Sequence, residues 1–184
     1  HPVAHSFPTR RSSDLETVHL YKQYIISAAR DRMIYIWNLH TGEVVQKWEA
    51  HTATITSLDT DSHYLVSGAK DRTVKLWDLD TWELVKTFTG HTGAILSVSI
   101  SQTHLASGSE DATIRIWNRA SGECIHILDQ HTRNVSWVKI QNQRLYSASW
   151  DHFLRVWDIE SGKCLAALEE GRPVEVNRTI PNVH

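Results

Sequence analysis

The feature that most constrains the fold is an eight-residue phrase that recurs at intervals of 40 residues. It reads DRTVKLWD from Asp71 to Asp78, and the variants DRMIYIWN, DATIRIWN and DHFLRVWD begin at Asp31, Asp111 and Asp151. A constant period of this length indicates a repeat architecture, in which each unit buries its apolar face only against its neighbours. Because a site of chemistry is normally built once, the recurrence favours a structural role for the phrase.

Each unit shows the alternation of apolar and polar residues that is typical of β-strands. Val74 and Leu76 alternate with Lys75, and the other copies keep this pattern. A short strand such as HYLVSG comes before the phrase, and a tight turn such as GAKD joins the two. A further strand such as LVKTFT follows the phrase, and another such as ILSVSI follows each His. Four short antiparallel strands per unit predict a propeller blade.

The conserved pattern of these units resembles that of WD-repeat β-propellers. The motifs that carry the resemblance are the GH pair at Gly90-His91, the SG-x-x-D turns, and the four WD or WN pairs such as Trp77-Asp78. The resemblance covers Glu16 to about Gly171. It implies an all-β fold of about four four-stranded antiparallel blades, which is part of a propeller that in this family usually has seven or eight blades.

The repeat register divides the chain into a leader, four repeats and a tail. Residues 1–15 are predicted to be a non-native leader, because Ala4–Leu15 resemble a translated sequencing adapter and do not match the register. The predicted repeats and tail are residues 16–51, 52–91, 92–131 and 132–171, with 172–184 as a degenerate start of the next repeat or a tail. We expect an open arc with two unpaired, adhesive blade faces; two copies that close an eight-bladed ring are the alternative.

Ser, Asp and Trp recur in every unit and His in three of them, and this set raises the possibility of hydrolase chemistry. His51, Ser67 and Asp71 are the types of a catalytic triad, but the set occurs three times, each time with a Trp. A buried Trp needs a partner for its indole N–H; Ser can accept that bond and donate to His, and His can donate to Asp. The resemblance implies such buried structural tetrads and no catalytic residue. The predicted tetrad residues are Ser27, Asp31 and Trp37; His51, Ser67, Asp71 and Trp77; His91, Ser107, Asp111 and Trp117; and His131, Ser147, Asp151 and Trp157.

Specificity is expected in the columns that vary between repeats. The family resemblance places two such columns on the narrow face of a propeller. The first column holds the residue before the turn Asp, and the second lies five residues after the His. The predicted partner-binding residues are Arg30, Lys70, Glu110 and Trp150 in the first column, and Thr56, Leu96 and Ser136 in the second. Such a rim suits a polar peptide with one aromatic or apolar anchor. The alternative for Trp150 is that it packs over its neighbours.

Two tryptophans replace small residues of the repeat. Trp82 stands where other copies have Gly42, Gly122 and Gly162, so we expect a different turn there, because positive φ is unfavourable for Trp. Trp137 stands where two copies have Ser, and we expect it to alter the packing between blades.

The bulk composition excludes several classes of protein. The chain has 184 residues, 41% hydrophobic and 22% charged, with a formal charge of -2, so it has neither a membrane span nor the basic footprint of a nucleic-acid-binding protein. Cys124 and Cys164 occupy the same place in successive repeats, so we expect small buried thiols in a reducing compartment, the cytoplasm or nucleus, rather than a disulfide.

The function that these features predict is a non-catalytic scaffold that binds a protein or peptide partner, with a larger multiprotein complex as one expected setting, and without cofactor or metal. The constant period most resembles F-box/WD-repeat proteins, which present substrates to a ubiquitin ligase, and this is the alternative. That family's phosphate-binding arginines lie in the two rim columns. Here only Arg30, and loosely Lys70, match, whereas Thr56, Leu96 and Ser136 depart. A hydrolase is the remote third hypothesis.

Overall fold

The computed structural model describes residues 15–169 and 172–174, and every regular element among them is a β-strand. The strands form four antiparallel sheets in chain order. The first sheet is β1 (Leu15–Tyr21), β2 (Tyr24–Ala29), β3 (Met33–Asn38) and β4 (Val44–Glu49), and the second is β5 (Ile55–Thr60), β6 (Tyr64–Ala69), β7 (Val74–Asp78) and β8 (Leu84–Phe88). The third is β9 (Ile95–Ile100), β10 (His104–Ser109), β11 (Ile114–Asn118) and β12 (Cys124–Leu128). The fourth is β13 (Val135–Gln141), β14 (Arg144–Ser149), β15 (Phe153–Asp158), β16 (Cys164–Glu169) and β17 (Arg172–Val174). Within this described part of the chain, no helix could span a membrane.

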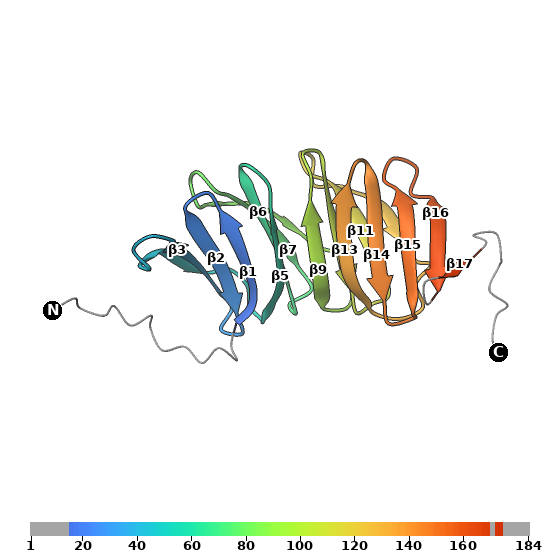
Figure 1. Ribbon diagram of the computed structural model, residues 1–184, viewed down its shortest axis with the longest axis horizontal. Coiled ribbons are helices and arrows are strands. Elements are labelled where there is room, and N and C mark those ends of the chain that lie inside the picture. The colour runs from blue at the N-terminus through green and yellow to red at the C-terminus, as the bar shows by residue number, and fades with distance from the viewer. Residues whose placement is uncertain (1–14, 170–171, 175–184) are drawn as a thin grey trace.

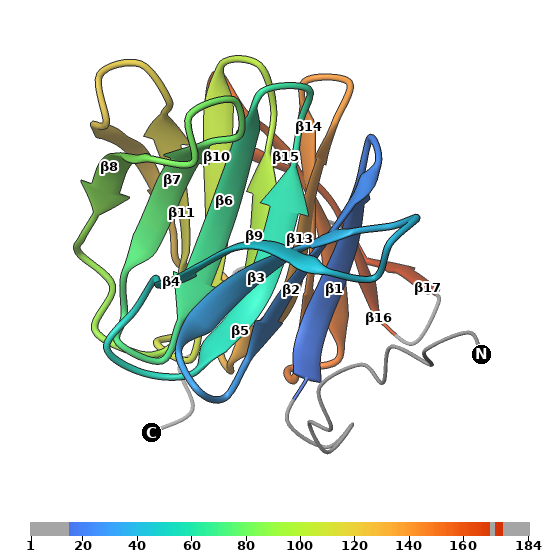
Figure 2. The same ribbon diagram turned by 90° about the vertical axis from the view of Figure 1, so that its left-hand side faces the viewer.

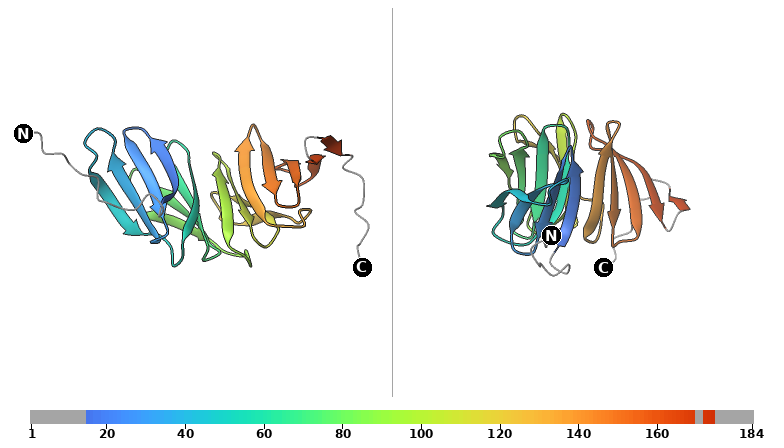
Figure 3. Two further views of the ribbon diagram at one scale, coloured as in Figure 1. Left: turned by 60° about the horizontal axis from the view of Figure 1, so that its bottom comes forward. Right: turned by 60° about the vertical axis from the view of Figure 1, so that its left-hand side comes forward.

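The sheets stand side by side as the blades of a β-propeller do, which confirms the predicted fold class. Figure 2, seen from the first sheet, shows β5 to β8 following one another from the inner to the outer side. The inner strands β1, β5, β9 and β13 are neighbours. Hydrogen bonds that join β9 to β5 and β13 to β9 include Val98 N to Ser57 Oγ and Val138 N to Ser97 Oγ, each at 3.1 Å. The first and fourth sheets lie at opposite ends of the row (Figures 1 and 3).

Apolar side chains fill the three layers between adjacent sheets. Each layer includes the Trp of the later sheet's third strand, namely Trp77, Trp117 or Trp157. In the middle layer Phe88 of β8 packs against Trp117 with ring centroids 5.5 Å apart. The core therefore lies between sheets rather than within any one of them, as expected for stacked repeats.

Tight turns join the second and third strands of all four sheets. We call these turns, at residues 30–32, 70–73, 110–113 and 150–152, the rim turns; they lie along the lower edge of the molecule in Figure 1. Each contains a non-glycine residue with φ near +70°: Arg32, Arg72, Ala112 or His152. Its N–H donates to a carbonyl three residues earlier, as from Arg72 N to Ala69 O at 3.2 Å. The left-handed conformation of these residues costs free energy that the closed turn offsets.

Strand pairing extends slightly beyond the predicted repeats at both ends. Leu15, the last residue of the predicted leader, pairs with Ala29 as the first residue of β1. The fourth sheet has a fifth strand, because β17 pairs with β16 in the segment predicted to be a degenerate repeat or tail. The adapter-like residues 4–14, together with Gly171, lie outside the described residues.

The expectation that Trp82 changes its turn is wrong. Trp82 has φ 63°, close to the 71° of Gly42, and its N–H donates to Asp78 O at 2.8 Å as the glycines' N–H groups do in their turns. Its indole packs against Tyr24 and Trp48 of the first sheet, at centroid distances of 5.8 and 6.4 Å. These contacts between sheets offset the backbone strain, which is on the order of 1–2 kcal/mol.

Trp137 is 48% exposed on β13. Its equivalents Ser57 and Ser97 contact the sheet that follows theirs, and the fourth sheet is the last one among the described residues, so the effect of Trp137 on packing between blades stays a prediction. One further expectation needs correction. Cys124 and Cys164 are free but only half-buried, because each borders a core layer at the point where its outer strand begins. Each thiol lies 3.4 Å from a carbonyl oxygen two residues later.

Both ends of the row expose apolar positions that are buried in the other sheets. Leu20 of β1 is 67% exposed, whereas its equivalent Ile100 is 7% exposed. Leu154 of β15 is 47% exposed, whereas its equivalent Ile114 is fully buried. Each end face is therefore one half of the contact that elsewhere joins two sheets, and exposed apolar surface of this kind favours association.

These end faces predict self-association of the 184-residue chain. Leu20→Glu and Leu154→Glu should each shift the chain toward the monomer in sedimentation velocity, because a charge cannot be buried unpaired in such a contact. Val85→Glu, at a position 49% exposed on the outer strand β8, is the matched control and should leave the distribution unchanged. Equal effects of all three substitutions would contradict a role for the end faces.

Candidate functional site

Three of the predicted tetrads are assembled by the same elements in the second, third and fourth sheets. The His precedes the inner strand, the Ser lies near the end of the second strand, the Asp lies in the rim turn, and the Trp lies on the third strand. In the third sheet Trp117 Nε1 donates to Ser107 Oγ at 3.0 Å, and Ser107 Oγ lies 2.8 Å from His91 Nε2. His91 Nδ1 lies 2.8 Å from Asp111 Oδ2. The corresponding distances in the other two sheets are 2.8 to 2.9 Å.

The direction of these hydrogen bonds follows from the chemistry of the groups. Since the indole N–H can only donate, the Ser oxygen accepts it and the Ser O–H donates to Nε2 of His. Because Nε2 accepts the Ser O–H, it carries no proton and the imidazole is neutral; its Nδ1–H then donates to the carboxylate. Burial lowers the pKa of His91 and of His131 below the ordinary value, and this outweighs the opposing effect of their Asp partners.

The carboxylates at the end of each chain are held in the ionised form. Burial acts to raise the pKa of Asp111, but hydrogen bonds from Thr113, His91 and the Thr92 N–H outweigh it and hold the pKa well below its usual range. The pKa of Asp71 is lowered in the same way, with burial again opposed by bonds from its His and Thr neighbours. The Asp therefore joins the rim turn to the residues that lead into the inner strand.

Burial of the tetrad argues against its use as a catalytic triad. Ser67 and Ser107 are 0% exposed and Ser147 is 1% exposed. Each hydroxyl lies between an indole N–H and an imidazole, with no open side from which an acyl group could approach. The arrangement matches a structural hydrogen-bond chain.

The first sheet contains the three predicted members of its set. Trp37 Nε1 donates to Ser27 Oγ at 2.8 Å, as in the other sheets. Asp31 accepts hydrogen bonds from Met33 N at 3.2 Å and from the Tyr35 hydroxyl at 3.0 Å. The position where the other repeats have His corresponds to Arg11, which lies outside the described residues.

The first predicted partner-binding column is exposed along the rim turns. Arg30, Lys70, Glu110 and Trp150 are all exposed, and Trp150 has 60% of its surface accessible. The backbone N–H of Lys70, of Glu110 and of Trp150 donates to a carbonyl just before the inner strand, at 2.8 to 3.0 Å. These residues therefore project from a backbone that is anchored in the same way in three sheets.

The second predicted column is half-buried and its hydroxyl groups are used within the protein. Thr56 Oγ1 lies 3.0 Å from Gly68 O and 2.6 Å from Ile95 O of the next sheet. Ser136 Oγ donates to Ala148 O at 3.3 Å, and Leu96 is half-buried. A partner at the rim therefore meets mainly the first column.

An ion pair on the first sheet joins a rim residue to the inner strand. Arg30 Nε donates to Glu16 Oε1 at 2.7 Å, and Glu16 stands in register with the second column. The basic character expected of Arg30 is thus partly balanced by a neighbouring carboxylate.

One ion pair that we did not expect from the sequence links three sheets on their inner side. Asp59 of β5 is 6% exposed and accepts hydrogen bonds from Ser99 Oγ at 2.9 Å and Ile100 N at 3.0 Å. Lys139 Nζ of β13 donates to both carboxylate oxygens of Asp59, at 3.0 Å to Oδ1 and 2.9 Å to Oδ2. The repeat places three of these residues in one column: Asp59, Ser99 and Lys139. The change from a negative to a positive residue within that column is the sequence signal that could reveal the pair.

The described residues contain no group of three or more His, Cys, Asp or Glu side chains that could hold a metal ion. The arrangement offers hydrogen-bonding and apolar contacts at the rim rather than a reactive group.

Comparison with known proteins agrees with the repeat architecture. The family model described as "WD domain, G-beta repeat" matches residues 42–78, 82–118 and 122–158, which together exceed half of the chain. Each match begins two residues before the outer strand of one sheet and ends at the Trp-Asp or Trp-Asn pair of the next. A solved structure described as "Structure of U3-55K" superposes with a TM-score of 0.79 at 22% identity, and supports the fold alone. The alignment covers 88% of this chain and 54% of that one, so this chain spans about half of its length.

Replacing Asp111 with Asn should destabilise the protein. The Asn oxygen can still accept the bond from His91, but the bond is no longer strengthened by the negative charge of the carboxylate. We therefore expect the free energy of unfolding to fall by about 1 to 3 kcal/mol in a denaturant titration. Glu110→Gln, at the exposed neighbouring residue, should change it by less than about 0.5 kcal/mol. Similar values for the two variants would show that the chain of bonds contributes little.

The tetrads also predict a pH dependence of stability. The pKa values of His91 and His131 are lower in the folded state, so unfolding takes up protons once the pH falls below the ordinary value of about 6.5. Stability should be complete above that pH and decline as the pH falls, by at most about 1.4 kcal/mol per pH unit for each proton taken up. Because the Asp pKa values are also lowered, a second decline should follow below about pH 4.

Melting temperatures measured from pH 7.5 to 5 test this dependence. His91→Gln should reduce the slope, whereas His40→Gln, at an exposed position, should retain it. A melting temperature that stays constant over this range would contradict the assignment of neutral buried histidines.

Proposed function

Because the chain belongs to the WD-repeat family, we propose that it is a non-catalytic interaction scaffold that binds a protein or peptide partner along its rim turns. The observation that carries this proposal is Trp150, which is 60% exposed in a turn whose backbone is held by a tetrad. WD-repeat proteins act in general as scaffolds for protein interactions. The family resemblance suggests the rim turns as the contact surface, and the exposed Trp150 supports that choice in this chain.

The rim offers one large anchor and several charges. An exposed Trp on a rigid turn can bury a large area at little cost in conformational entropy, and Trp is enriched among residues that dominate binding energy. Lys70 and Glu110 on the neighbouring turns carry opposite charges. The matching partner is a polar peptide with one apolar or aromatic side chain that packs against Trp150.

The net charge and the free cysteines indicate which class of partner and which cellular compartment suit this scaffold. A formal charge of -2 favours protein partners over nucleic acid, since nucleic-acid binding depends on a basic surface. Two unpaired cysteines fit a reducing compartment such as the cytoplasm or nucleus. A scaffold in this setting can take part in a larger multiprotein complex.

A narrower proposal is that the rim is the substrate-recognition surface of an F-box/WD-repeat protein. Arg30 and Lys70 are the two basic residues of the first column, and phosphate groups favour such residues. A phosphopeptide would have to compete with Glu16 for Arg30, because that ion pair is already formed at 2.7 Å. The rim thus supports the general scaffold better than phosphate recognition.

Hydrolysis by the repeated His, Ser and Asp is the third hypothesis, and the geometry disfavours it. The nucleophile would be a fully buried Ser that already accepts an indole N–H. Catalysis would require opening the same bonds that stabilise the sheet.

Substitution of Trp150 tests the proposed rim. Peptides selected by the wild-type chain from a random display library should bind Trp150→Ala at least tenfold more weakly in isothermal titration calorimetry, because the anchor is lost. Ile127→Ala, at a 53% exposed position on the outer strand β12, is the matched control and should bind normally. Both variants should unfold within about 0.5 kcal/mol of wild type.

Two outcomes would contradict this proposal. Equal affinity of wild type and Trp150→Ala would place the contact elsewhere. A large loss of stability in Trp150→Ala would make it a packing residue. If selected peptides require a phosphate and lose affinity in Lys70→Ala, the narrower proposal would be favoured.

A further inference from the structure

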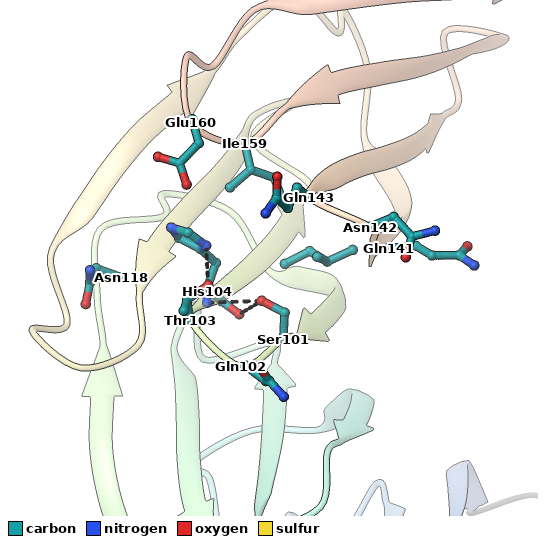
Figure 4. Close-up of a pocket in the computed structure, with 11 residues that line it drawn as sticks. Ser101, Gln102, Thr103, His104, Asn118, Gln141, Asn142, Gln143, Ile159 and Glu160 are labelled. Carbon is teal, nitrogen blue, oxygen red and sulfur yellow. Dashed lines mark hydrogen bonds between the residues drawn. The ribbon is translucent and has the colours of Figure 1, made fainter.

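A groove lies between the third and fourth sheets at the edge opposite the rim turns. Its volume is about 770 Å³, and Figure 4 shows the side chains that border it. The turn after β9 (Ser101–Thr103) and His104 form one wall, and the turn after β13, with Asn142 and Gln143, forms another. Ile159 and Glu160, which follow β15, form a third side.

The equivalent position between the second and third sheets is filled by the protein itself. Arg119, one repeat before Ile159, reaches back to the second sheet, where its Nη1 donates to Asp61 Oδ2 at 2.5 Å. The same nitrogen donates to Ser101 O at 3.1 Å. Its guanidinium lies 4.7 Å from the centroid of the Tyr64 ring. Carboxylate, carbonyl and ring thus hold an internal guanidinium at this junction.

The junction between the first and second sheets is filled in a different way. Leu79 takes the place of Arg119 and is 3% exposed. The Tyr21 hydroxyl donates across the junction to Ser62 O at 2.7 Å. Trp82 packs edge-on against Tyr24 at the same junction. Two of the three junctions are therefore closed by their own side chains.

The third junction lacks both kinds of filling. Ile159 is short and 2% exposed, so it forms the floor of the groove rather than filling it. Ser101 stands where Asp61 and Tyr21 stand in the other junctions, and His104 stands where each has a Tyr. Because the residues in all three columns differ at this junction, the space that Arg119 fills one junction earlier stays open.

The lining of the groove favours a positively charged group. Glu160 is the one carboxylate among the lining residues, and neither Lys nor Arg is among them. Gln143 lines the groove with a further amide oxygen, whereas the side-chain oxygens of Ser101 and Asn118 already accept backbone N–H groups. Glu160 is exposed and Figure 4 shows its carboxylate on the same side of the groove as the His104 ring.

The walls are held in place before any ligand arrives. Asn142 and Gln143 both have positive φ, 49° and 61°, which is the conformation of a tight two-residue hairpin turn. The opposite wall is closed by reciprocal bonds between Ser101 and His104, at 3.0 Å from Ser101 Oγ to His104 O and 3.1 Å from His104 N to Ser101 Oγ. A preformed groove loses little conformational entropy on binding.

From these observations we propose that the groove binds an arginine side chain of a partner protein, with the guanidinium where Arg119 places its own one junction earlier. Glu160 would take the part of Asp61 as the anionic partner, and the His104 ring the part of Tyr64. This site lies on the edge opposite Trp150 and does not depend on the proposed rim contact. A scaffold with both sites could hold two partners at once.

A small arginine probe tests the proposal on the full 184-residue chain. N-acetyl-arginine methylamide should bind with a Kd on the order of 1 to 10 mM, as expected for a ligand of this size, in a ¹H–¹⁵N NMR titration. The shifted amides should be those of Ser101–His104, Gln141–Gln143 and Ile159–Glu160. N-acetyl-citrulline methylamide has nearly the same shape without the charge and should shift them at least fivefold less at equal concentration.

Two substitutions in the groove separate binding from folding. Glu160→Gln changes an exposed side chain, so the fold should be kept while affinity for the probe falls by about fivefold. Ile159→Arg should fill the groove from within and abolish the shifts. Because Ile159→Arg replaces a buried residue and can impair folding, Glu160→Gln remains the decisive variant.

The reciprocal substitution is a positive control for the assay. Arg119→Ala should open the junction between the second and third sheets and create a second probe site beside Asp61, with shifts near residues 61–64. The proposal is overturned if citrulline and arginine probes act alike, if the shifts map outside the groove, or if Glu160→Gln binds as wild type does.

Discussion

The hydrogen-bond chain from Trp to Ser to His to Asp is the constraint on which the rest of the structure depends. It joins the third strand, the second strand, the segment before the inner strand and the rim turn of one sheet through three short bonds, as from Trp117 through Ser107 and His91 to Asp111. The Asp also accepts the N–H of the residue after the His, at 2.9 Å from Thr92 N to Asp111. In the second, third and fourth sheets these bonds fix where the chain enters the sheet, and the entry point determines how that sheet packs against the sheet before it.

This constraint separates the parts of a repeat that can vary from those that cannot. A buried Ser, His or Asp that loses its partner leaves a polar group without a hydrogen bond, at a cost of about 1 to 3 kcal/mol. The residue just before the Asp meets no such restriction, because the turn itself needs only its backbone N–H, as in the bond from Trp150 N to Asn134 O at 3.0 Å. Arg, Lys, Glu and Trp can therefore occupy the same place on the same turn. Chemical variety accumulates on a rim whose backbone stays the same.

The strands and the tetrads could be predicted from the sequence because both follow a strict period. Alternation of Val74, Lys75 and Leu76 shows which side chains face the core, and the spacing of His, Ser, Asp and Trp repeats without drift. The turn at Trp82 could not be predicted in this way. Its positive φ is unfavourable locally, and the contacts with Tyr24 and Trp48 that offset the cost come from another sheet. The half-buried state of Thr56 was missed for the same reason, since one of its acceptors, Ile95 O, belongs to the next sheet.

The groove shows how a repeat can gain a site without a change in its fold. The column of Leu79, Arg119 and Ile159 lies after the third strand, outside the tetrad, so its side chain can change while the sheet keeps its bonds. With Arg119 the junction carries an internal ion pair and is closed; with Ile159 and the neighbouring Ser101 it is open. The groove cannot be recognised within one repeat, because its walls come from two sheets and its outline depends on an absent side chain. Comparison of equivalent junctions reveals it, since each closed junction shows which group fits the open one.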